Sequence, residues 1–199
     1  MTDPLVAAVP ATELVRRLVA AGQTVATAES LTAGLLSATI AGIPGASAVL
    51  RGGLIVYATD LKQQLAGVSG ATLAADGPVA ATTAEQLAVG AATVCGADWG
   101  IGLTGVAGPQ SQDGHPVGTV FLGVAGPDAV HVVRLTLPGD RWSIRIGAVR
   151  AAVAELIRAL DGENSVAPGT KRPRGSVICE NGISANGITD DARSGQVET

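Results

Sequence analysis

Residues 24–41 read Thr-Val-Ala-Thr-Ala-Glu-Ser-Leu-Thr-Ala-Gly-Leu-Leu-Ser-Ala-Thr-Ile-Ala, and this stretch decides the fold class. Its first part, 24–29, is a short run of β-type residues that ends at Ser30. The remainder, 31–41, has apolar residues at helical spacing and is stopped by Gly42. A strand followed at once by a helix is the building unit of an α/β domain.

The same alternation of strand and helix patterns predicts one domain at residues 1–160. Further helices are expected at 12–21, 60–65, 82–95 (capped by Thr82 or Thr83) and 140–160, and further strands at 54–57, 99–104, 117–124 and 130–137. Elements in this order predict a three-layer α/β/α sandwich with a mixed sheet. Beyond the domain, Gly, Asn, Ser, Pro and short charged runs replace the apolar pattern, so 161–199 is expected to be a flexible tail.

Composition excludes several classes of partner. The chain has 199 residues and a net charge of −4, so no basic surface indicates nucleic acid or an anionic membrane. No apolar run reaches membrane-spanning length, and Met1–Pro10 lacks the pattern of a signal peptide. The two cysteines, Cys95 and Cys179, have no metal-ligand or redox spacing. A soluble cytoplasmic protein is therefore expected.

One apparent motif does not indicate a dinucleotide site. Residues 100–105 read Gly-Ile-Gly-Leu-Thr-Gly, which matches the G-x-G-x-x-G pattern of Rossmann domains. That pattern has to follow a strand and open a helix, whereas here it lies inside a predicted strand and Pro109 follows shortly afterwards. A Rossmann site is excluded on this ground.

Lysine usage points to a candidate base. Residues 1–160 contain eight arginines and one lysine, Lys62. An arginine stays protonated in proteins, whereas a desolvated lysine can lose its proton and act as a base. The alternative is an ordinary surface lysine on a short helix. Tyr57, the one tyrosine of the chain, precedes it at a strand end and could bind a nucleophile or a ligand ring, or simply cover the sheet edge.

Ser30 is a candidate nucleophile because it stands where a strand meets a helix. A serine there is commonly a helix cap, but the same position exposes its hydroxyl beside helix amides that stabilise negative charge. Thr32 and Gly34 would allow a phosphate or carbonyl oxygen to come close. Glu29 could orient the site or accept hydrogen bonds from backbone amides, and the sequence leaves both roles open.

Two further segments could bind an anion. Thr104-Gly105-Val106-Ala107-Gly108-Pro109 follows a strand and could present backbone N–H groups to an anion, or could be a plain tight turn. Arg141 and Arg145 at the start of the last helix could hold a phosphate, or could form surface ion pairs. His115 and His131 have no ligand-spaced partners, so neither a metal site nor a histidine base is expected. A Ser–Lys pair remains possible.

Taken together, these segments resemble the CinA C-terminal domain family, the nicotinamide-nucleotide amidases. The resemblance covers about residues 10–160 in ordered blocks, which are Thr27-Ala28-Glu29-Ser30 with Thr32 and Gly34, Pro44-Gly45-Ala46-Ser47, Gly52-Gly53, Tyr57 with Lys62, Thr104 to Pro109, Pro116 to Val120, and Gly139-Asp140-Arg141. It implies a pocket for nicotinamide mononucleotide, no cofactor, and a homodimer or larger assembly.

The resemblance also implies a role for each candidate. Ser30 would attack the carboxamide carbon, and Lys62 would take the serine proton and pass a proton to the departing ammonia. Tyr57 would assist through its hydroxyl or pack on the pyridine ring. Thr104, with the amides at Gly105 and Ala107, would face the phosphate or the developing oxyanion. Gly108 belongs to the same substrate-binding stretch.

The sequence departs from the family pattern around the expected pocket. Leu31 and Ala33 stand where Cys and Gly are usual, Ala58-Thr59 where Ser-Asn is usual, and 110–115 replaces a Gly-rich stretch and a lysine. Two alternatives stay open: an amidase for a different nicotinamide-containing nucleotide, and a catalytically silent nucleotide-binding or regulatory module. Many relatives carry a large N-terminal nucleotide-hydrolysing domain, and the chain is expected to lack that second activity.

Overall fold

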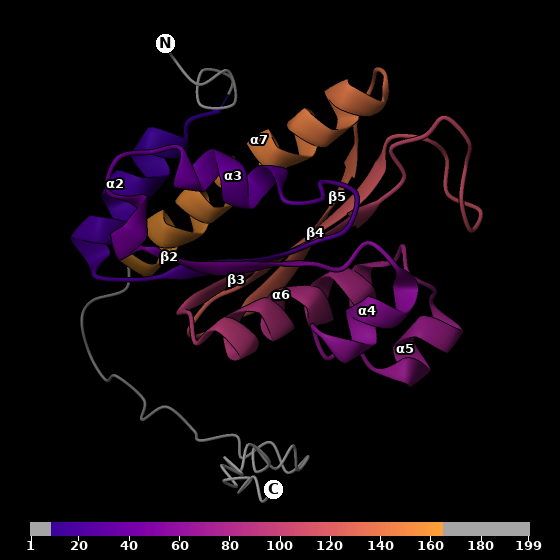
Figure 1. The fold of residues 1–199 in the computed structure, drawn as a ribbon, viewed down its shortest axis with the longest axis horizontal. Coiled ribbons are helices and arrows are strands. Elements are labelled where there is room, and N and C mark those ends of the chain that lie inside the picture. The colour runs from indigo at the N-terminus through magenta and orange to yellow at the C-terminus, as the bar shows by residue number, and fades with distance from the viewer. Residues whose placement is uncertain (1–8, 165–199) are drawn as a thin grey trace, which may run out of the picture. The chain divides into compact units, whose positions relative to one another are not determined.

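A computed structural model describes residues 9–164 as one five-stranded sheet with helices on both faces (Figure 1). The strand order is β2-β1-β3-β4-β5, with bounds β1 Val25–Glu29, β2 Leu50–Ile55, β3 Trp99–Gly105, β4 Thr119–Ala125 and β5 Val130–Thr136. Strand β1 pairs in parallel with β2 and β3, whereas β4 pairs antiparallel with β3 and β5. The predicted mixed sheet is confirmed.

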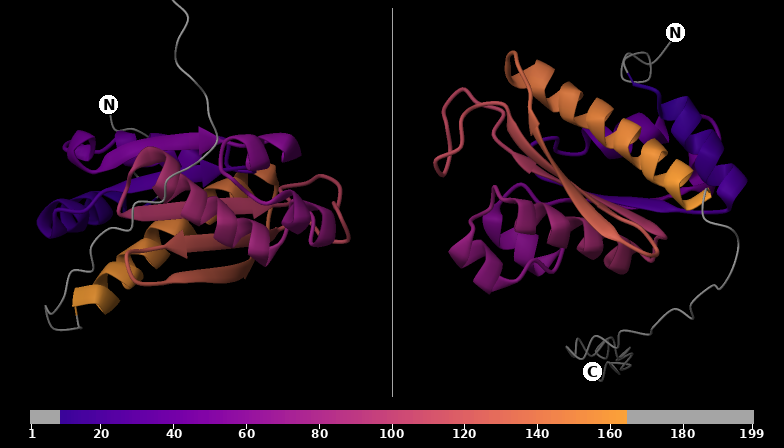
Figure 2. Two further views of the ribbon diagram at one scale, coloured as in Figure 1. Left: turned by 90° about the horizontal axis from the view of Figure 1, so that it is seen from below. Right: turned by 180° about the vertical axis from the view of Figure 1, so that it is seen from behind.

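The helices form two layers around this sheet (Figure 2). One layer holds α2 (Ala11–Ala21), α3 (Leu35–Ala41) and α7 (Arg141–Asn164), which contact one another; the other holds α4 (Thr59–Gln64), α5 (Gly70–Ala75) and α6 (Ala81–Cys95). A short 3-10 helix, η1 (Ala46–Ala48), leads into β2. The larger core lies between the sheet and the first layer, and its fully buried side chains include Leu14, Leu18, Ile101, Leu122, Ile144 and Leu156.

Glycines on the other face of the sheet let α6 pack unusually close. A Cβ atom at Gly100 would lie 1.9 Å from the carbonyl oxygen of Ala88, and one at Gly102 would lie 2.3 Å from that of Ala84. Both distances are far inside van der Waals contact, so neither position can hold a side chain without moving the helix. Helix packing therefore explains Gly100 and Gly102, the first two glycines of the apparent dinucleotide motif, whereas a Cβ at Gly105 would meet Thr119 and Val120 of β4.

The helix expected at 31–41 begins later than the sequence suggested. Ala33 has φ +50° and Gly34 has φ +91°, so both lie in the left-handed region that cannot continue a right-handed helix. Residues 30–34 therefore form a turn, and α3 starts at Leu35. The apolar spacing alone could not reveal this interruption, because Ala is otherwise the strongest helix former.

Other boundaries differ by smaller amounts. Strand β2 ends at Ile55, so the expected strand at 54–57 was placed too late, and α7 continues past residue 160. Helix α6 begins after Ala80 without a side-chain cap, since the hydroxyls of Thr82 and Thr83 donate to Asp76 and to the Gly77 carbonyl instead. Helix α5, which the sequence analysis missed, has Ser69 as its cap.

Some of the sequence-based expectations concern residues outside 9–164. The proposed tail at 161–199 lies almost entirely outside the described residues, as does Cys179. Within residues 9–164, no helix is long and apolar enough to cross a bilayer, and no group of three or more His, Cys, Asp or Glu side chains is placed to hold a metal ion.

Candidate active site

A small cavity opens at the carboxyl ends of the parallel strands, where open α/β sheets usually bind ligands. Its volume is about 110 Å³. Eight of the predicted site residues line it, namely Ser30, Tyr57, Lys62, Thr104, Gly105, Ala107, Gly108 and Arg141. Four others, Glu29, Thr32, Gly34 and Arg145, do not. The tertiary structure thus gathers segments that are up to about a hundred residues apart in the sequence.

Ser30 and Lys62 meet at the bottom of this cavity. The Lys62 Nζ atom lies 3.0 Å from Ser30 Oγ, 2.8 Å from the Val56 carbonyl oxygen and 3.3 Å from the Tyr57 carbonyl oxygen. The Ser30 backbone is held in turn by β3, because its N–H donates to the Leu103 carbonyl. Only 2% of Lys62 is exposed, so the interpretation of this residue as a surface lysine is wrong.

The surroundings of Lys62 make its amine easier to deprotonate than that of a lysine in water. Burial lowers the pKa of its ammonium group from 10.5 to about 8. Among residues 9–164, no acidic side chain lines the cavity to offset that effect. A neutral amine has two N–H donors and one lone pair. The two neighbouring carbonyls can therefore accept the two donors, which leaves the lone pair for the proton of Ser30. This arrangement matches a lysine that serves as a general base.

Glu29 contacts the main chain rather than the cavity. It is fully buried and accepts hydrogen bonds from the backbone N–H groups of Gly34, Leu36 and Ser37 and from the hydroxyls of Thr27 and Ser37. Of the two roles that the sequence left open, binding of backbone amides is the one observed. The amides of α3 are thereby occupied, so they cannot stabilise negative charge at Ser30 as expected.

Thr32 and Gly34 also lie away from the cavity. Thr32 is fully buried, and its Oγ1 is the one buried side-chain polar atom without a hydrogen-bond partner in residues 9–164. Gly34 has its left-handed φ at the last position of the turn, against Ile55. The prediction that these residues touch the substrate is therefore not supported by their position; both shape the turn that carries Ser30.

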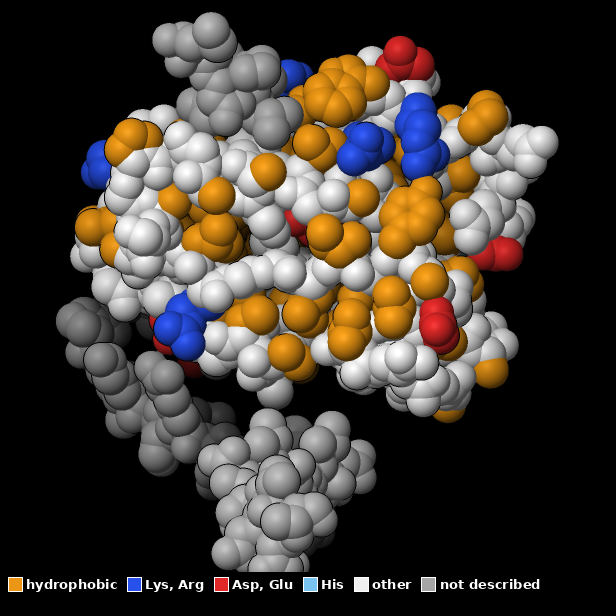
Figure 3. Space-filling view, in the orientation of Figure 1, with side chains coloured by type: hydrophobic (Ala, Val, Ile, Leu, Met, Phe, Trp, Pro, Cys, Tyr) orange, Lys and Arg blue, Asp and Glu red, His pale blue; other side chains and the backbone are white. Residues whose placement is uncertain are grey.

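Arg141 spans the mouth of the cavity. Its Nη2 donates to the Tyr57 hydroxyl at 2.8 Å, and its Nη1 donates to the Gly108 carbonyl at 2.8 Å. These two acceptors stand on opposite walls, one after β2 and one after β3. The Tyr57 hydroxyl thus contacts Arg141, and it is the backbone carbonyl of Tyr57 that contacts Lys62. Basic side chains gather at the upper right of the face in Figure 3, among hydrophobic ones.

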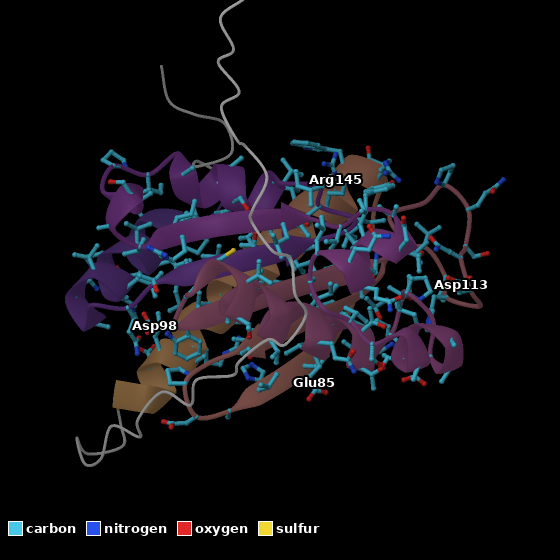
Figure 4. The ribbon with its side chains drawn as sticks, turned by 60° about the horizontal axis from the view of Figure 1, so that its bottom comes forward. Glu85, Asp98, Asp113 and Arg145 are labelled. Carbon is cyan, nitrogen blue, oxygen red and sulfur yellow. The ribbon has the colours of Figure 1, made fainter. Side chains whose placement is uncertain are left out.

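Arg145 was predicted as a phosphate ligand, but it binds the main chain instead. Its Nε donates to the Leu31 carbonyl at 3.0 Å and its Nη2 to the Thr32 carbonyl at 2.9 Å, while its guanidinium stacks near the Trp142 ring at 5.9 Å. Figure 4 shows Arg145 near the start of α7, toward the same end of the sheet as Asp113. Because Arg145 binds the turn after Ser30 and does not line the cavity, its position does not support the predicted phosphate-binding role.

In the wall after β3, the Gly105 N–H is a candidate donor for an oxyanion whose direction the sheet fixes. The Thr104 hydroxyl donates its hydrogen to the Pro78 carbonyl at 2.6 Å, so this hydrogen does not face an oxyanion as the prediction required. The N–H of Val106 donates to the Thr119 carbonyl in β4. In an antiparallel ladder, alternate residues turn their N–H groups to opposite sides. Gly105 therefore directs its N–H away from β4, toward the side where β1 ends and Ser30 begins.

Further residues line the cavity, namely Leu31, Thr59, Pro78, Val79, Val106, Gln110 and Gln112. The departures from the family pattern at Leu31, Thr59 and 110–115 had already been placed around the expected pocket, whereas Pro78 and Val79 were not predicted. The segment that carries Gln110 and Gln112 is stabilised by a tight turn in which Asp113 and Gly114 both have positive φ. Pro78 and Val79 carry no local signal and reach the cavity only through the tertiary fold.

Comparison with known proteins places the chain among CinA proteins. The profile of the CinA C-terminal domain family matches residues 8–160. A CinA-like protein of Frankia casuarinae is 46% identical over 145 residues, which make up 73% of this chain and 34% of that protein. A CinA-like protein of Anaeromyxobacter dehalogenans is 44% identical over 148 residues, which make up 74% of this chain and 36% of that protein. The chain therefore spans about a third of the length of these curated relatives.

Solved structures show the same similarity in three dimensions. A competence-damaged protein (CinA) superfamily protein from Klebsiella pneumoniae superposes with a TM-score of 0.76 at 29% identity, over 80% of this chain and 99% of that one. A competence/damage inducible protein from Agrobacterium tumefaciens gives a TM-score of 0.70 at 35% identity, over 76% and 95% of the two chains. These similarities confirm the predicted fold.

Proposed function

The chain belongs to the CinA C-terminal domain family, and from this premise we propose that it hydrolyses nicotinamide mononucleotide to nicotinic acid mononucleotide and ammonia. Such a reaction serves pyridine nucleotide salvage. The observation that carries the proposal is the buried contact of 3.0 Å between Ser30 Oγ and Lys62 Nζ. A serine beside a lysine of lowered pKa is a recurring arrangement for attack on an amide carbonyl.

The proposed reaction begins with a proton transfer from Ser30 to neutral Lys62. Ser30 Oγ then forms a bond to the carboxamide carbon, and the carbonyl oxygen becomes an oxyanion that the Gly105 N–H stabilises. As the C–N bond breaks, the Lys62 ammonium passes its proton to the leaving nitrogen, which departs as ammonia. The product of this first half of the reaction is an ester between Ser30 and the substrate acyl group, with neutral Lys62 beside it.

Water completes the cycle in the second half of the proposed reaction. Lys62 takes a proton from the water, whose oxygen attacks the ester carbon. Collapse of the intermediate releases the carboxylic acid, and the Lys62 proton returns to Ser30 Oγ. The acid then loses its own proton to solvent. Mass spectrometry of a rapidly quenched reaction would show the ester as an adduct on the peptide that contains Ser30.

The charges around the cavity support an anionic substrate. Lys62 and Arg141 line the cavity, and within the described part of the chain no acidic side chain does. Arg141 binds two neutral acceptors, the Tyr57 hydroxyl and the Gly108 carbonyl, in place of a carboxylate. A guanidinium gains more from a phosphate than from neutral oxygens. A cavity of about 110 Å³ is small for a whole nucleotide, so we place the pyridine carboxamide inside and the phosphate at Arg141.

The test is ammonia release from nicotinamide mononucleotide by the purified chain. Ser30→Ala and Lys62→Arg should both abolish it, because the first removes the nucleophile and the second replaces a base with a group that keeps its proton. Ser69→Ala and Lys171→Arg are the matched controls and should retain full activity. Turnover that survives in Lys62→Arg would remove Lys62 from the mechanism.

The outcomes also separate the alternatives. Turnover of NAD or another nicotinamide-containing nucleotide in preference to the mononucleotide would assign a different substrate to the same Ser–Lys pair. Stabilisation by the mononucleotide without ammonia release would identify a silent binding module. Binding at a hundred times Kd adds about 2.7 kcal/mol to the free energy of unfolding, which is measurable as a rise in Tm.

A further inference from the structure

The turn that carries Ser30 adopts a conformation that depends on its surroundings. Residues 30–34 belong to no helix or strand, and Ala33 and Gly34 both have positive φ. A non-glycine residue such as Ala33 adopts this conformation only where neighbouring contacts hold it. The position of the Ser30 hydroxyl therefore depends on whichever groups hold the turn.

Glu29 holds the end of the turn and the beginning of α3. Its Oε2 accepts from the N–H groups of Gly34 and Leu36 at 3.0 Å each, and its Oε1 accepts from the N–H of Ser37 at 2.9 Å. The carboxylate is fully buried. It therefore fixes the main chain after Ser30 without reaching the cavity.

Arg145 holds the beginning of the same turn from a different element. Two of its N–H groups bind the carbonyls of Leu31 and Thr32, the two residues that follow Ser30. Glu29 thus accepts from N–H groups of this segment while Arg145 donates to its carbonyls. The planar guanidinium suits two consecutive carbonyls, whereas a lysine ammonium would offer no such fork.

Neither charge is explained by an ion pair. Within residues 9–164, no salt bridge involves Glu29 or Arg145. The Glu29 carboxylate is satisfied instead by five hydrogen-bond donors from Thr27, Gly34, Leu36 and Ser37, all of which stand in the segment around Ser30. We propose that Glu29 and Arg145 are a pair of positioning residues, which hold the 30–34 turn so that the Ser30 hydroxyl stays against the Lys62 amine. This inference rests on the proposed amidase function for its kinetic consequences.

The kinetic consequence follows from the short distance between the two catalytic groups. A misplacement of about 1 Å at a reacting group can reduce the rate about a hundredfold. Because Glu29 and Arg145 do not line the cavity, their loss should lower kcat and leave KM for the mononucleotide unchanged. If either residue bound the substrate directly, its loss would raise KM instead.

The first variant is Arg145→Ala, with Arg158→Ala on the exposed side of the same helix as the matched control. We expect kcat to fall about a hundredfold in Arg145→Ala and not at all in Arg158→Ala. Added guanidinium ion should restore part of the activity of Arg145→Ala and none of Ser30→Ala. Unchanged kcat in Arg145→Ala, or a rise in KM alone, would overturn the assignment for Arg145.

The second variant is Glu29→Gln, which keeps the shape of the side chain but has one oxygen instead of two. Its amide NH2 group would face N–H groups of the turn, so we expect a loss in kcat similar to that of Arg145→Ala. If Glu29→Gln does not fold, Arg145→Ala still tests whether the 30–34 turn positions Ser30, since the Arg145 side chain is only half-buried.

A crystal structure of Arg145→Ala tests the inference without any substrate. We expect the Ser30 Oγ to Lys62 Nζ distance to exceed 3.5 Å in the variant. A distance that stays at 3.0 Å would overturn the positioning role even if the wild-type protein is an active amidase. Conversely, a displaced Ser30 in a protein that releases no ammonia from the mononucleotide would leave the positioning role intact and reject the proposed function.

Discussion

The pH dependence of the reaction tests the role of Lys62 most directly. With the Lys62 pKa at about 8, about 9% of the protein carries the neutral amine at pH 7 and about 91% at pH 9. The value of kcat/KM should therefore rise about tenfold over this interval and become level above pH 9. An ordinary lysine pKa of 10.5 would instead give a rise of about a hundredfold that continues beyond pH 10.

The assay is the initial rate of ammonia release from nicotinamide mononucleotide between pH 6 and pH 10.5. Ser30→Ala supplies the blank for alkaline breakdown of the substrate at each pH. The pKa can also be measured without turnover, because the chain has only two lysines, Lys62 and Lys171. In protein labelled at lysine, NMR resolves two side-chain signals, and Lys62→Arg identifies which of them belongs to Lys62.

Two results would refute this reasoning. The first is a profile of kcat/KM that is flat from pH 6 to pH 10. A base that must lose its proton before it can act would instead make kcat/KM rise with pH. The second is a Lys62 signal that titrates near 10.5, because burial without an acidic neighbour should lower the pKa. Agreement between the kinetic and NMR values would assign the kinetic group to Lys62.

Four further predictions concern stability, specificity and assembly. The pKa of Lys62 is lower in the folded chain than in the unfolded chain. Between pH 8 and pH 10.5 the unfolded chain therefore binds one more proton at Lys62 than the folded chain does. Chemical denaturation should therefore show wild type gaining about 2.5 kcal/mol relative to Lys62→Met from pH 7 to pH 10, and an unchanged difference would contradict the shift. Arg141→Met should raise KM for the mononucleotide at least about tenfold while leaving nicotinamide riboside, which has no phosphate, unaffected; equal effects on both would argue against phosphate binding. Gly102→Ala should destabilise the fold by about 1–3 kcal/mol in urea, because its Cβ would lie 2.3 Å from the Ala84 carbonyl, whereas Gly162→Ala, with open space around it, should not. Light scattering should show a homodimer or larger assembly, and a monomer at micromolar concentration would contradict that prediction.

Much of the fold was predictable because periodicity is a local property. The strand at Val25–Glu29, the helix at Ala11–Ala21 and the antiparallel pair formed by β4 and β5 all follow from patterns of apolar residues within short windows. The order of these elements then restricts the fold to a few layered architectures. The late start of α3 was not predictable in this way, because the positive φ of Ala33 belongs to a turn that is also bound by Arg145, a residue far along the chain.

The chemistry of the site was likewise only partly predictable from the sequence. The sequence by itself singled out Ser30 and Lys62 as separate candidates and left a Ser–Lys pair possible, and the resemblance to the CinA C-terminal domain family joined them as a pair. Only the tertiary structure decided that Lys62 is buried against Ser30, and that Glu29 and Arg145 hold the main chain instead of a substrate. The physical reason is that a pKa, a hydrogen bond and the reach of a side chain depend on neighbours across the fold, which residue order does not specify.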